Sequence, residues 1–307
     1  MKYSLEQFIE ISELDSAEAS ALKTYLADSE TVKLAESIAE QTFINGNFEN
    51  LPYFPEGAYL SQAWFVAAFL SFDNSYERYQ KLNFPEAVWL DSMTDLKIWL
   101  RNELHNRNVI GLGKLARPWE VAMYQGVVSR HGRLECNTSC NYKRSNLTDR
   151  SGKTILKTGD QVINLHIPEA GAMDMDACGR SLQKMAEFFA KYRSDYQWKG
   201  FLCESWLLDR QLEALLPETS NILKFQKLGI KYTLDCPSDA IVRIFGVDDW
   251  QSVPVKTSLQ RNAAEFLKNG GAFLEEGIFI PRESVEAVNF DLNKLLENNQ
   301  RSLSSMS

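Results

Sequence analysis

The sequence lacks a hydrophobic run long enough to cross a lipid bilayer. Its longest uninterrupted apolar stretch, residues 63–70, contains eight residues, whereas a membrane-spanning helix needs roughly 20. Residues 1–6 contain no apolar segment of the kind that directs secretion. We therefore expect a cytoplasmic protein with no membrane partner.

Cysteine is scarce, and positive charge is outnumbered. The 307 residues include five cysteines, an odd number without the regular spacing of a disulfide framework. Asp and Glu total 41 against 33 Lys and Arg, a net charge of −8. This balance argues against broad nucleic-acid binding, which requires a basic surface. We expect a reduced protein that acts on a small molecule and binds no nucleic acid.

Common signatures of nucleotide and metal sites are also missing. Gly111 and Gly113 have neither the spacing of a P-loop nor the third glycine of a dinucleotide-binding turn. His131, Cys136 and Cys140 include too few ligands for a zinc site, because no fourth ligand or second Cys-x-x-Cys pair accompanies them. We therefore predict no metal.

The first part of the chain has the periodicity of helices. Residues 59–79 carry tryptophan and phenylalanine at helical spacing and are apolar on most sides, so we expect this segment at the centre of a helical region. Phe-Pro-Glu at residues 84–86 starts another helix, with the proline in its first turn. We predict a helical N-terminal domain over residues 1–125.

The rest of the chain alternates between short strands and helices. Residues 154–157 and 161–167 predict the two strands of a hairpin, and residues 199–206 predict another strand. Strands mixed with helices after a helical region indicate the α+β class. We predict a mixed β-sheet domain with flanking helices over residues 126–307.

The segment 161–168, Gln-Val-Ile-Asn-Leu-His-Ile-Pro, is the most informative part of the sequence. It predicts a strand that ends at a proline, followed by a loop at 169–173 and a helix that starts at Asp174. A strand, a small-residue loop and a helix N-terminus form a geometry that binds phosphates. The candidate cofactor-binding residues in this loop are Ala170, Gly171, Ala172 and Met173. The alternative is that Asp174 and Asp176 cap the helix themselves.

His166 lies at the end of this predicted strand. Strand alternation places it on one face with Asn164, whereas the aliphatic residues between them point to the other face. Ligands bind near strand ends in open α/β sheets, so His166 is a candidate ligand contact or proton acceptor. The alternative is a structural histidine that is hydrogen-bonded inside the protein.

A second candidate base follows in the segment 201–209, Phe-Leu-Cys-Glu-Ser-Trp-Leu-Leu-Asp. This segment predicts a strand that runs into a turn, with Glu204 and Trp206 on the same face. Glu204 is a candidate general base. The alternative is a strand whose tryptophan packs against the rest of the protein.

Several segments in combination resemble a bacterial family of acyltransferase-domain proteins. The segments that carry the resemblance are Ile-Asn-Leu-His-Ile-Pro at 163–168, Phe-Phe at 188–189, Cys-Glu-Ser-Trp-Leu-Leu-Asp at 203–209, Leu-Leu-Pro at 215–217, Ser-Asn-Ile at 220–222 and Thr-Ser-Leu-Gln-Arg at 257–261. The N-terminal part agrees through Phe-Pro-Glu at 84–86, Trp99, Gly-Leu at 111–112, Trp119 and Gly-Arg-Leu at 132–134. The resemblance extends over most of the chain, from about residue 29 to about residue 277.

The resemblance implies a helical N-terminal domain followed by a GNAT-like domain, which transfers an acyl group from acetyl-CoA or another acyl-CoA to an amine. In that fold two neighbouring strands, here residues 161–167 and 199–206, diverge and hold the pantetheine arm between them. The residues implied in acyl-CoA binding are Ile167, Ala170, Gly171, Ala172, Met173 and Trp206. The implied catalytic bases are His166 and Glu204.

Two departures from the family pattern leave an alternative open. The pyrophosphate loop of GNAT proteins normally has a basic or amide residue followed by Gly-x-Gly or Gly-x-Ala, whereas this chain has Gly171-Ala172 flanked by acids. Relatives often have histidine where this chain has Glu204. The alternative is a non-catalytic GNAT-like module that binds a ligand or a protein.

Overall fold

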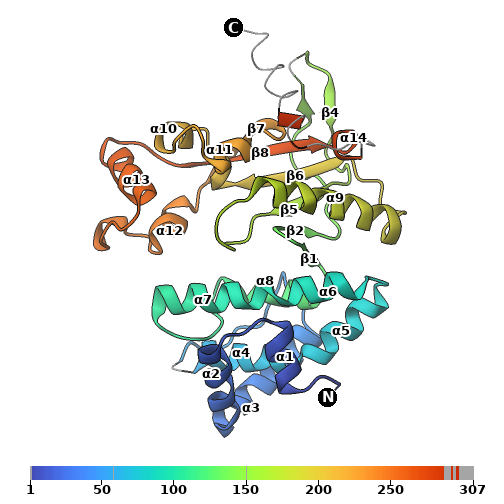
Figure 1. Cartoon of the computed structure of the whole chain (residues 1–307), viewed down its shortest axis with the longest axis vertical. Helices are drawn as coiled ribbons and strands as arrows, with labels where there is room; N and C mark the ends of the chain where they lie inside the picture. The colour runs from blue at the N-terminus through green and yellow to red at the C-terminus, as the bar shows by residue number, and fades with distance from the viewer. Residues whose placement is uncertain (1, 58, 150, 287–291, 293–294, 297–307) are drawn as a thin grey trace. The chain divides into compact units, whose positions relative to one another are not determined.

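The computed structural model describes the chain except for residues 1, 58, 150, 287–291, 293–294 and 297–307 (Figure 1). Two compact units make up the chain. The first comprises Met1–Thr138 and Ile167–Ala170, and the second comprises Ser139–His166 and Gly171–Ser307. The predicted domain boundary between residues 125 and 126 stays a prediction.

The first unit is helical, as predicted, and ends in a β-hairpin. Its elements are α1 (Leu5–Ile11), α2 (Ser16–Leu26), α3 (Ser29–Ile38), the π-helical turn η1 (Ala39–Ile44), α4 (Leu60–Leu70), α5 (Phe72–Lys81), α6 (Glu86–Met93), α7 (Asp95–Arg107), α8 (Ala116–Tyr124), β1 (Val128–His131) and β2 (Leu134–Asn137). In the described part of the chain, no helix combines the length and apolarity that a membrane span requires.

Helix α4 occupies the centre of this unit. Its side chains are buried on almost every side, including those of Trp64 and Phe65, which confirms the prediction from the all-round apolar pattern. The segment 59–79 nevertheless forms two helices. The backbone of Ser71 leaves the helical region at ψ 2° and separates α4 from α5.

Three of the carboxyl groups buried in the first unit interact with one another. Asp95, Glu120 and Glu135 are each at most 1 % exposed. The Asp95 carboxylate accepts a hydrogen bond from Nε1 of Trp99 at 2.9 Å, and Nη1 of Arg130 lies 3.8 Å from Oδ1 of Asp95 and 3.9 Å from Oε1 of Glu135. One guanidinium therefore faces two of the three acids.

Burial raises the pKa of all three carboxyl groups. For Glu120 and Glu135 the neighbouring Asp95 carboxyl raises the pKa further, well above the ordinary value. Hydrogen bonding among them favours a charged Asp95 and protonated glutamates. Neither oxygen of Glu120 accepts a hydrogen bond from an N–H group in the described part of the chain. The interior is therefore compatible with one negative charge at Asp95 and neutral Glu120 and Glu135.

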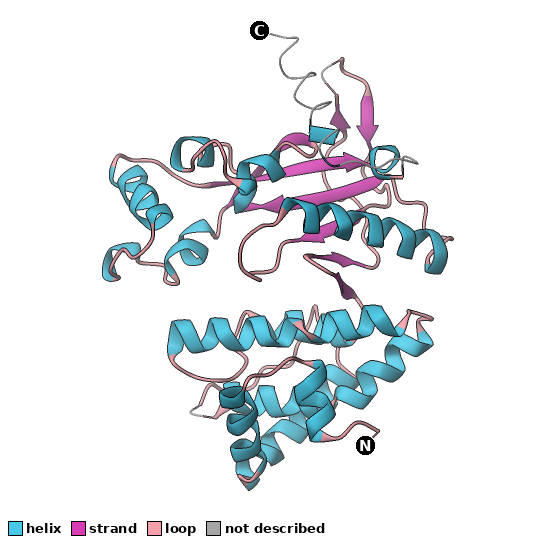
Figure 2. Cartoon of the chain, in the orientation of Figure 1, coloured by secondary structure: helices cyan, strands magenta, loops and turns pink. Residues whose placement is uncertain are grey.

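The second unit contains a mixed sheet with flanking helices, which confirms the predicted α+β class (Figure 2). Its elements are β3 (Leu147–Thr148), β4 (Thr154–Leu156), β5 (Ile163–His166), α9 (Met175–Tyr192), β6 (Gly200–Ser205), the 3₁₀ turn η2 (Trp206–Leu208), α10 (Leu212–Leu215), α11 (Asn221–Gln226), β7 (Ile230–Pro237), α12 (Ala240–Phe245), the 3₁₀ turn η3 (Trp250–Ser252), α13 (Ser258–Lys268), β8 (Leu274–Pro281) and α14 (Arg282–Val285). Its main strands follow the order β5-β6-β8-β7, in which β5 and β6 are parallel and the other neighbours are antiparallel.

Helix α9 covers one face of this sheet. It begins after Asp174, as predicted, because the Asp174 carboxylate accepts a hydrogen bond from the backbone N–H of Ala177 at 2.7 Å. Its buried stripe includes Cys178, Leu182, Met185 and Phe189. The ring of Phe189 packs on Trp198, which in turn packs on Phe201 of β6. This buried stripe is the face of α9 that packs on the sheet.

The predicted hairpin between residues 154–157 and 161–167 is wrong. Strand β4 pairs with β3 in a separate two-stranded sheet, and β5 pairs with β6. The turn that was expected to join them bonds to Tyr142 instead. The N–H of Gly159 donates to the Tyr142 carbonyl, and the Tyr142 N–H donates to the Asp160 carbonyl, both at 2.8 Å. The backbone groups of this turn therefore form hydrogen bonds with Tyr142, which lies outside the expected hairpin.

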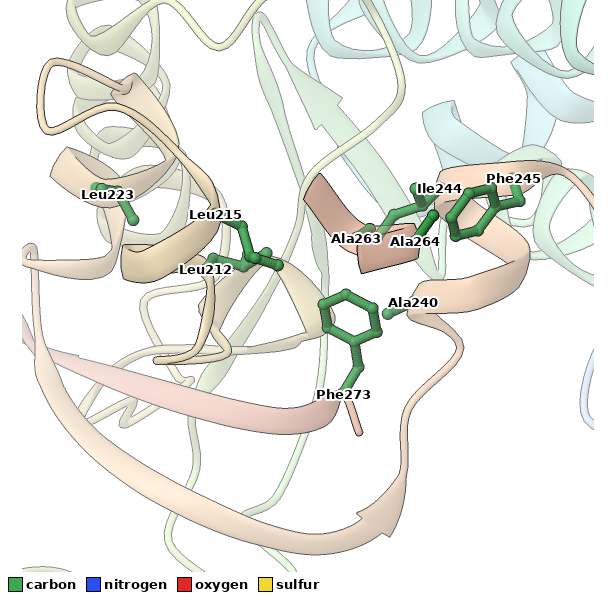
Figure 3. Packing of buried hydrophobic residues seen from close by; sticks show 9 residues of the cluster. All are labelled: Leu212, Leu215, Leu223, Ala240, Ile244, Phe245, Ala263, Ala264 and Phe273. Atoms are coloured by element: carbon green, nitrogen blue, oxygen red, sulfur yellow. The ribbon is translucent and has the colours of Figure 1, made fainter. Parts of the chain in front are cut away.

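A separate apolar cluster lies among the short helices that follow β6 (Figure 3). Its buried residues are Leu212, Leu215, Leu223, Ala240, Ile244, Phe245, Ala263, Ala264 and Phe273. Helix α13 contributes to this cluster and starts after Thr257, which caps it in a capping box with Gln260. Gly270 lies just beyond its end at φ +84°.

Candidate active site

The parallel pairing of β5 and β6 stops before β6 ends. The paired residues are Ile163 with Phe201, Asn164 with Leu202 and Leu165 with Cys203. Strand β6 continues through Glu204 and Ser205, which pair with Gly277 and Glu276 of β8 on its other side. The register between β5 and β6 therefore ends at Leu165 and Cys203, directly before the two candidate bases.

His166 and Glu204 occupy the same face of the sheet. Phe201 and Cys203 point toward α9, since Phe201 packs on Trp198 and the pKa of Cys203 is raised by burial, Glu204 and Cys178. Strand alternation then directs Leu202 and Glu204 to the opposite face. Residues paired in a parallel sheet point to the same side, so Asn164 and His166 share that face. The structure thus brings the two candidates to one side of the sheet, each one residue past the last pair.

His166 is held in a low-polarity environment. Burial lowers the pKa of its imidazole to about 4, although part of the residue's surface remains accessible. Nδ2 of Asn164 lies 3.5 Å from Nε2 of His166. The ring is therefore neutral near pH 7, and a neutral imidazole has a nitrogen lone pair that accepts a proton.

Both carboxylate oxygens of Glu204 are engaged by other side chains. Nε of Arg144 donates to Oε1 at 2.6 Å, and Nη2 donates to Oε2 at 2.8 Å. The hydroxyl of Tyr232 donates to Oε1 at 2.9 Å. A bidentate arginine pair gives a fixed geometry as well as charge neutralisation. For Glu204 to accept a proton, this arrangement would have to open.

Tyr232 reaches Glu204 across a glycine. Gly277 of β8 pairs with Tyr232 on one side and with Glu204 on the other. A Cβ atom at position 277 would collide with the ring and hydroxyl of Tyr232. The missing side chain therefore lets the tyrosine lie over β8 and bond to a residue two strands away.

The loop after β5 exposes its backbone near the start of α9. Gly171 has φ +78°, with open space where a side chain would begin, and Gly171 and Ala172 are exposed. Met173 is 8 % exposed, and its carbonyl accepts a hydrogen bond from Nδ2 of Asn221 at 2.7 Å. Asp174 caps the helix, as the alternative interpretation expected. Phosphate contacts by this loop remain a prediction.

The other two residues implied in acyl-CoA binding lie in different surroundings. Ile167 directly follows β5 and belongs with the first unit. Trp206 begins η2, and its half-buried side chain packs against the apolar cluster of α10–α13. This agrees with the alternative interpretation of residues 201–209, in which the tryptophan packs against the rest of the protein. Its role in acyl-CoA binding is not tested by this geometry.

Sequence reasoning missed Arg144, Tyr232 and Gly277. Arg144 was visible only as a charge in a polar loop, and it lies 60 residues from Glu204 in the sequence. Tyr232 is 28 residues from Glu204. A glycine inside a strand is the one local signal for such a site, because it permits close approach of another group.

Comparisons with known proteins agree with this architecture. Residues 128–279 match the family profile of the GNAT-like C-terminal domain. An acyltransferase solved in complex with decanoyl-CoA and teicoplanin is similar at 18% identity and a TM-score of 0.70, over 90% of this chain and 87% of that chain. A variant acyltransferase in complex with octanoyl-CoA is similar at 17% identity, with the same TM-score and coverage. None of the curated proteins matches the chain. At these identities the structural similarity concerns the fold.

Proposed function

Because residues 128–279 of this chain form a GNAT-like C-terminal domain, we propose that the protein is an acyltransferase that uses an acyl-CoA and acylates an amine. The observation that carries the proposal is the end of the β5–β6 register at Leu165 and Cys203, with His166 and Glu204 on one face directly beyond it. Backbone groups past the last pair are suited to bond a pantetheine arm as an added strand would.

The solved structures of similar fold support an acyl-CoA as the donor. One holds decanoyl-CoA with teicoplanin, and another holds octanoyl-CoA. A donor that binds beyond the last β5–β6 pair would bring its thioester close to His166. The exposed residues Gly171 and Ala172, next to the start of α9, would meet the pyrophosphate.

The proposed reaction is a direct transfer. The neutral amine attacks the thioester carbonyl carbon, a C–N bond forms, and the C–S bond breaks to release CoA as a thiolate, which then takes up a proton. Neutral His166 accepts the proton that the amine nitrogen loses, and Glu204 orients the amine. Backbone N–H groups near Ile167 stabilise the oxyanion. Glu204 is the alternative base.

Calorimetric titration with acetyl-CoA, octanoyl-CoA and decanoyl-CoA tests this function. We expect saturable binding of at least one of the three, because acyltransferases of similar fold were solved with decanoyl-CoA and octanoyl-CoA. Absence of binding by all three at high protein concentration would contradict the proposal. That result would favour the alternative of a non-catalytic GNAT-like module.

Replacing Asp174 with serine is expected to tighten CoA binding. Serine retains the N-cap hydrogen bond but removes a negative charge from the place where a phosphate would lie. We expect the dissociation constant for CoA to fall about twofold to fivefold, since a charge at a helix N-terminus contributes roughly 0.3–1 kcal/mol. The matched control is Asp195→Ser, which lies beyond the far end of α9 and should leave affinity unchanged. Weaker binding by the Asp174 variant would argue against this loop as the phosphate site.

A further inference from the structure

Several contacts fix the loop that carries Arg144. The side chain of Tyr142 is 3% exposed and packs into the cluster that includes Leu202 and Phe279. The hydroxyl of Thr158 donates to the Arg144 carbonyl at 2.5 Å, and the Cys140 N–H donates to the Tyr196 hydroxyl at 2.7 Å. After Arg144, Oδ1 of Asn146 accepts a hydrogen bond from the Thr158 N–H at 3.2 Å. The loop is therefore anchored on both sides of Arg144, which positions the guanidinium in advance.

The ion pair between Arg144 and Glu204 is accessible to a ligand. The Arg144 side chain is 41% exposed and the Glu204 side chain is 25% exposed. Exposed ion pairs typically contribute no more than about 1 kcal/mol to stability, so a ligand with matching charges can replace them. Tyr232 holds Oε1 of Glu204 from the other direction and keeps the carboxylate in place while Arg144 changes partner.

The charges at this site select for a particular kind of amine. An ammonium group that pairs with Glu204 takes the carboxylate away from Arg144 and leaves the guanidinium without its anion. A carboxylate or phosphate on the same ligand restores that pair, because arginine binds both in a bidentate manner. Glu275 is close enough for its charge to interact with both Glu204 and Arg144, so a ligand with only a negative charge is disfavoured.

We infer that Arg144, Glu204 and Tyr232 form the recognition site for the acceptor, and that the acceptor is a zwitterion. Its ammonium pairs with Glu204 on binding and loses one proton to bulk water before the neutral amine attacks. Its carboxylate or phosphate, a few bonds away, pairs with Arg144. α-Amino acids and their phosphonate or phosphate counterparts have this charge arrangement. The inference rests on the proposed function, since it names the substrate class of the same site.

Direct binding to the full-length protein tests the inference with probes that differ only in charge. L-phenylalanine is compared with phenethylamine and 3-phenylpropanoate, and L-alanine with ethylamine and propanoate. O-phosphoethanolamine against ethanolamine distinguishes a phosphate from a carboxylate as the anionic group. Affinities are measured by ligand-observed NMR titration. We expect at least one zwitterion to bind about tenfold or more tightly than its matched amine and acid, as a charged hydrogen-bonded pair is worth that factor.

The variant Arg144→Gln separates recognition from a merely structural role. In this variant the zwitterion should lose about tenfold in affinity, whereas the matched amine should bind more tightly than in the wild type, because it no longer competes with the guanidinium. Arg144→Lys should retain part of the zwitterion preference, since it retains the charge but not the bidentate geometry. Gly277→Ala, which displaces Tyr232, should weaken binding of zwitterion and amine alike.

Two results would overturn the inference. One is that no zwitterion in the panel binds more tightly than its matched amine. The other is that Arg144→Gln weakens the zwitterion and the amine by the same factor. Acyl-CoA calorimetry distinguishes failure of this inference from failure of the proposed function. Binding of acyl-CoA without a zwitterion preference refutes only the recognition site, and a zwitterion preference without acyl-CoA binding refutes only the transferase.

Discussion

Replacing His166 with alanine is expected to lower turnover at least about tenfold while the protein remains folded. A positioned general base typically contributes 10²- to 10⁴-fold to a reaction, and tenfold is a conservative lower limit. His166 lies at the end of β5 with part of its surface accessible, so its removal should not disturb the sheet. Turnover is measured as release of CoA thiol from an acyl-CoA donor in the presence of the amine panel.

The matched control is His105→Ala, which removes an exposed histidine from α7 in the other unit. Circular dichroism and acyl-CoA calorimetry verify that both variants fold and bind the donor. Unchanged turnover in His166→Ala would remove this residue from the mechanism. If His166→Ala retains turnover and Glu204→Gln lowers kcat without raising the KM for the amine, Glu204 is the base.

The pH dependence of turnover provides an independent check on His166. Burial lowers the pKa of its imidazole to about 4, well below the ordinary value of about 6.5. The ring is therefore neutral and competent as a base throughout the range from pH 5 to pH 8. We expect the acidic limb that depends on His166 to lie near pH 4 and not near 6.5. A limb near 6.5 that disappears in His166→Ala would show that the ring is more exposed in the working enzyme.

Replacing Glu120 with glutamine is expected to stabilise the first unit, increasingly so as the pH rises. Burial and the Asp95 carboxyl raise the pKa of Glu120 well above its ordinary value. The unfolded chain therefore loses this proton at a lower pH than the folded chain does. The stability that the protonated group contributes is complete below the ordinary pKa of about 4.3 and is lost as the pH rises toward the raised value.

Glutamine removes this pH-dependent loss because its amide does not titrate, and its Nε2 can donate to Asp95 as the protonated acid does. We expect similar stabilities near pH 4 and an advantage for Glu120→Gln that grows as the pH rises, by up to about 1.4 kcal/mol per pH unit, until the raised pKa of Glu120 is reached. Urea unfolding from pH 4 to pH 9 measures the difference. The matched control is Glu77→Gln on α5, whose side chain is 62% exposed, and it should show no such trend. A constant difference between Glu120→Gln and wild type would show that Glu120 is ionised in the fold.

Local patterns predicted the elements of the fold well. The start of α9 at Asp174 and the buried character of α4 follow from side chains within a few turns of one another. Helical and strand periods are set by the backbone, so the positions of apolar residues reveal which face is buried. The two candidate bases were likewise placed from strand alternation alone, and β5 and β6 bring them to one face.

Pairing between distant segments was less accessible to such reasoning. The hairpin expected between residues 154–157 and 161–167 does not form, because Tyr142 takes the backbone groups of the turn. The apolar pattern of a short strand indicates which side is buried but not which strand lies next to it. The choice of partner depends on the packing of the whole sheet.

The order of side chains along the chain determined that helices come first, that a mixed sheet follows and that His166 and Glu204 stand at strand ends. These properties depend on the backbone period, which is local. Only the tertiary structure decided that Arg144 and Tyr232 occupy both oxygens of Glu204 and that Asp95, Glu120 and Glu135 share one buried interior. Charges meet across long sequence separations when the chain folds, and their interaction depends on distance and burial, which the sequence does not specify.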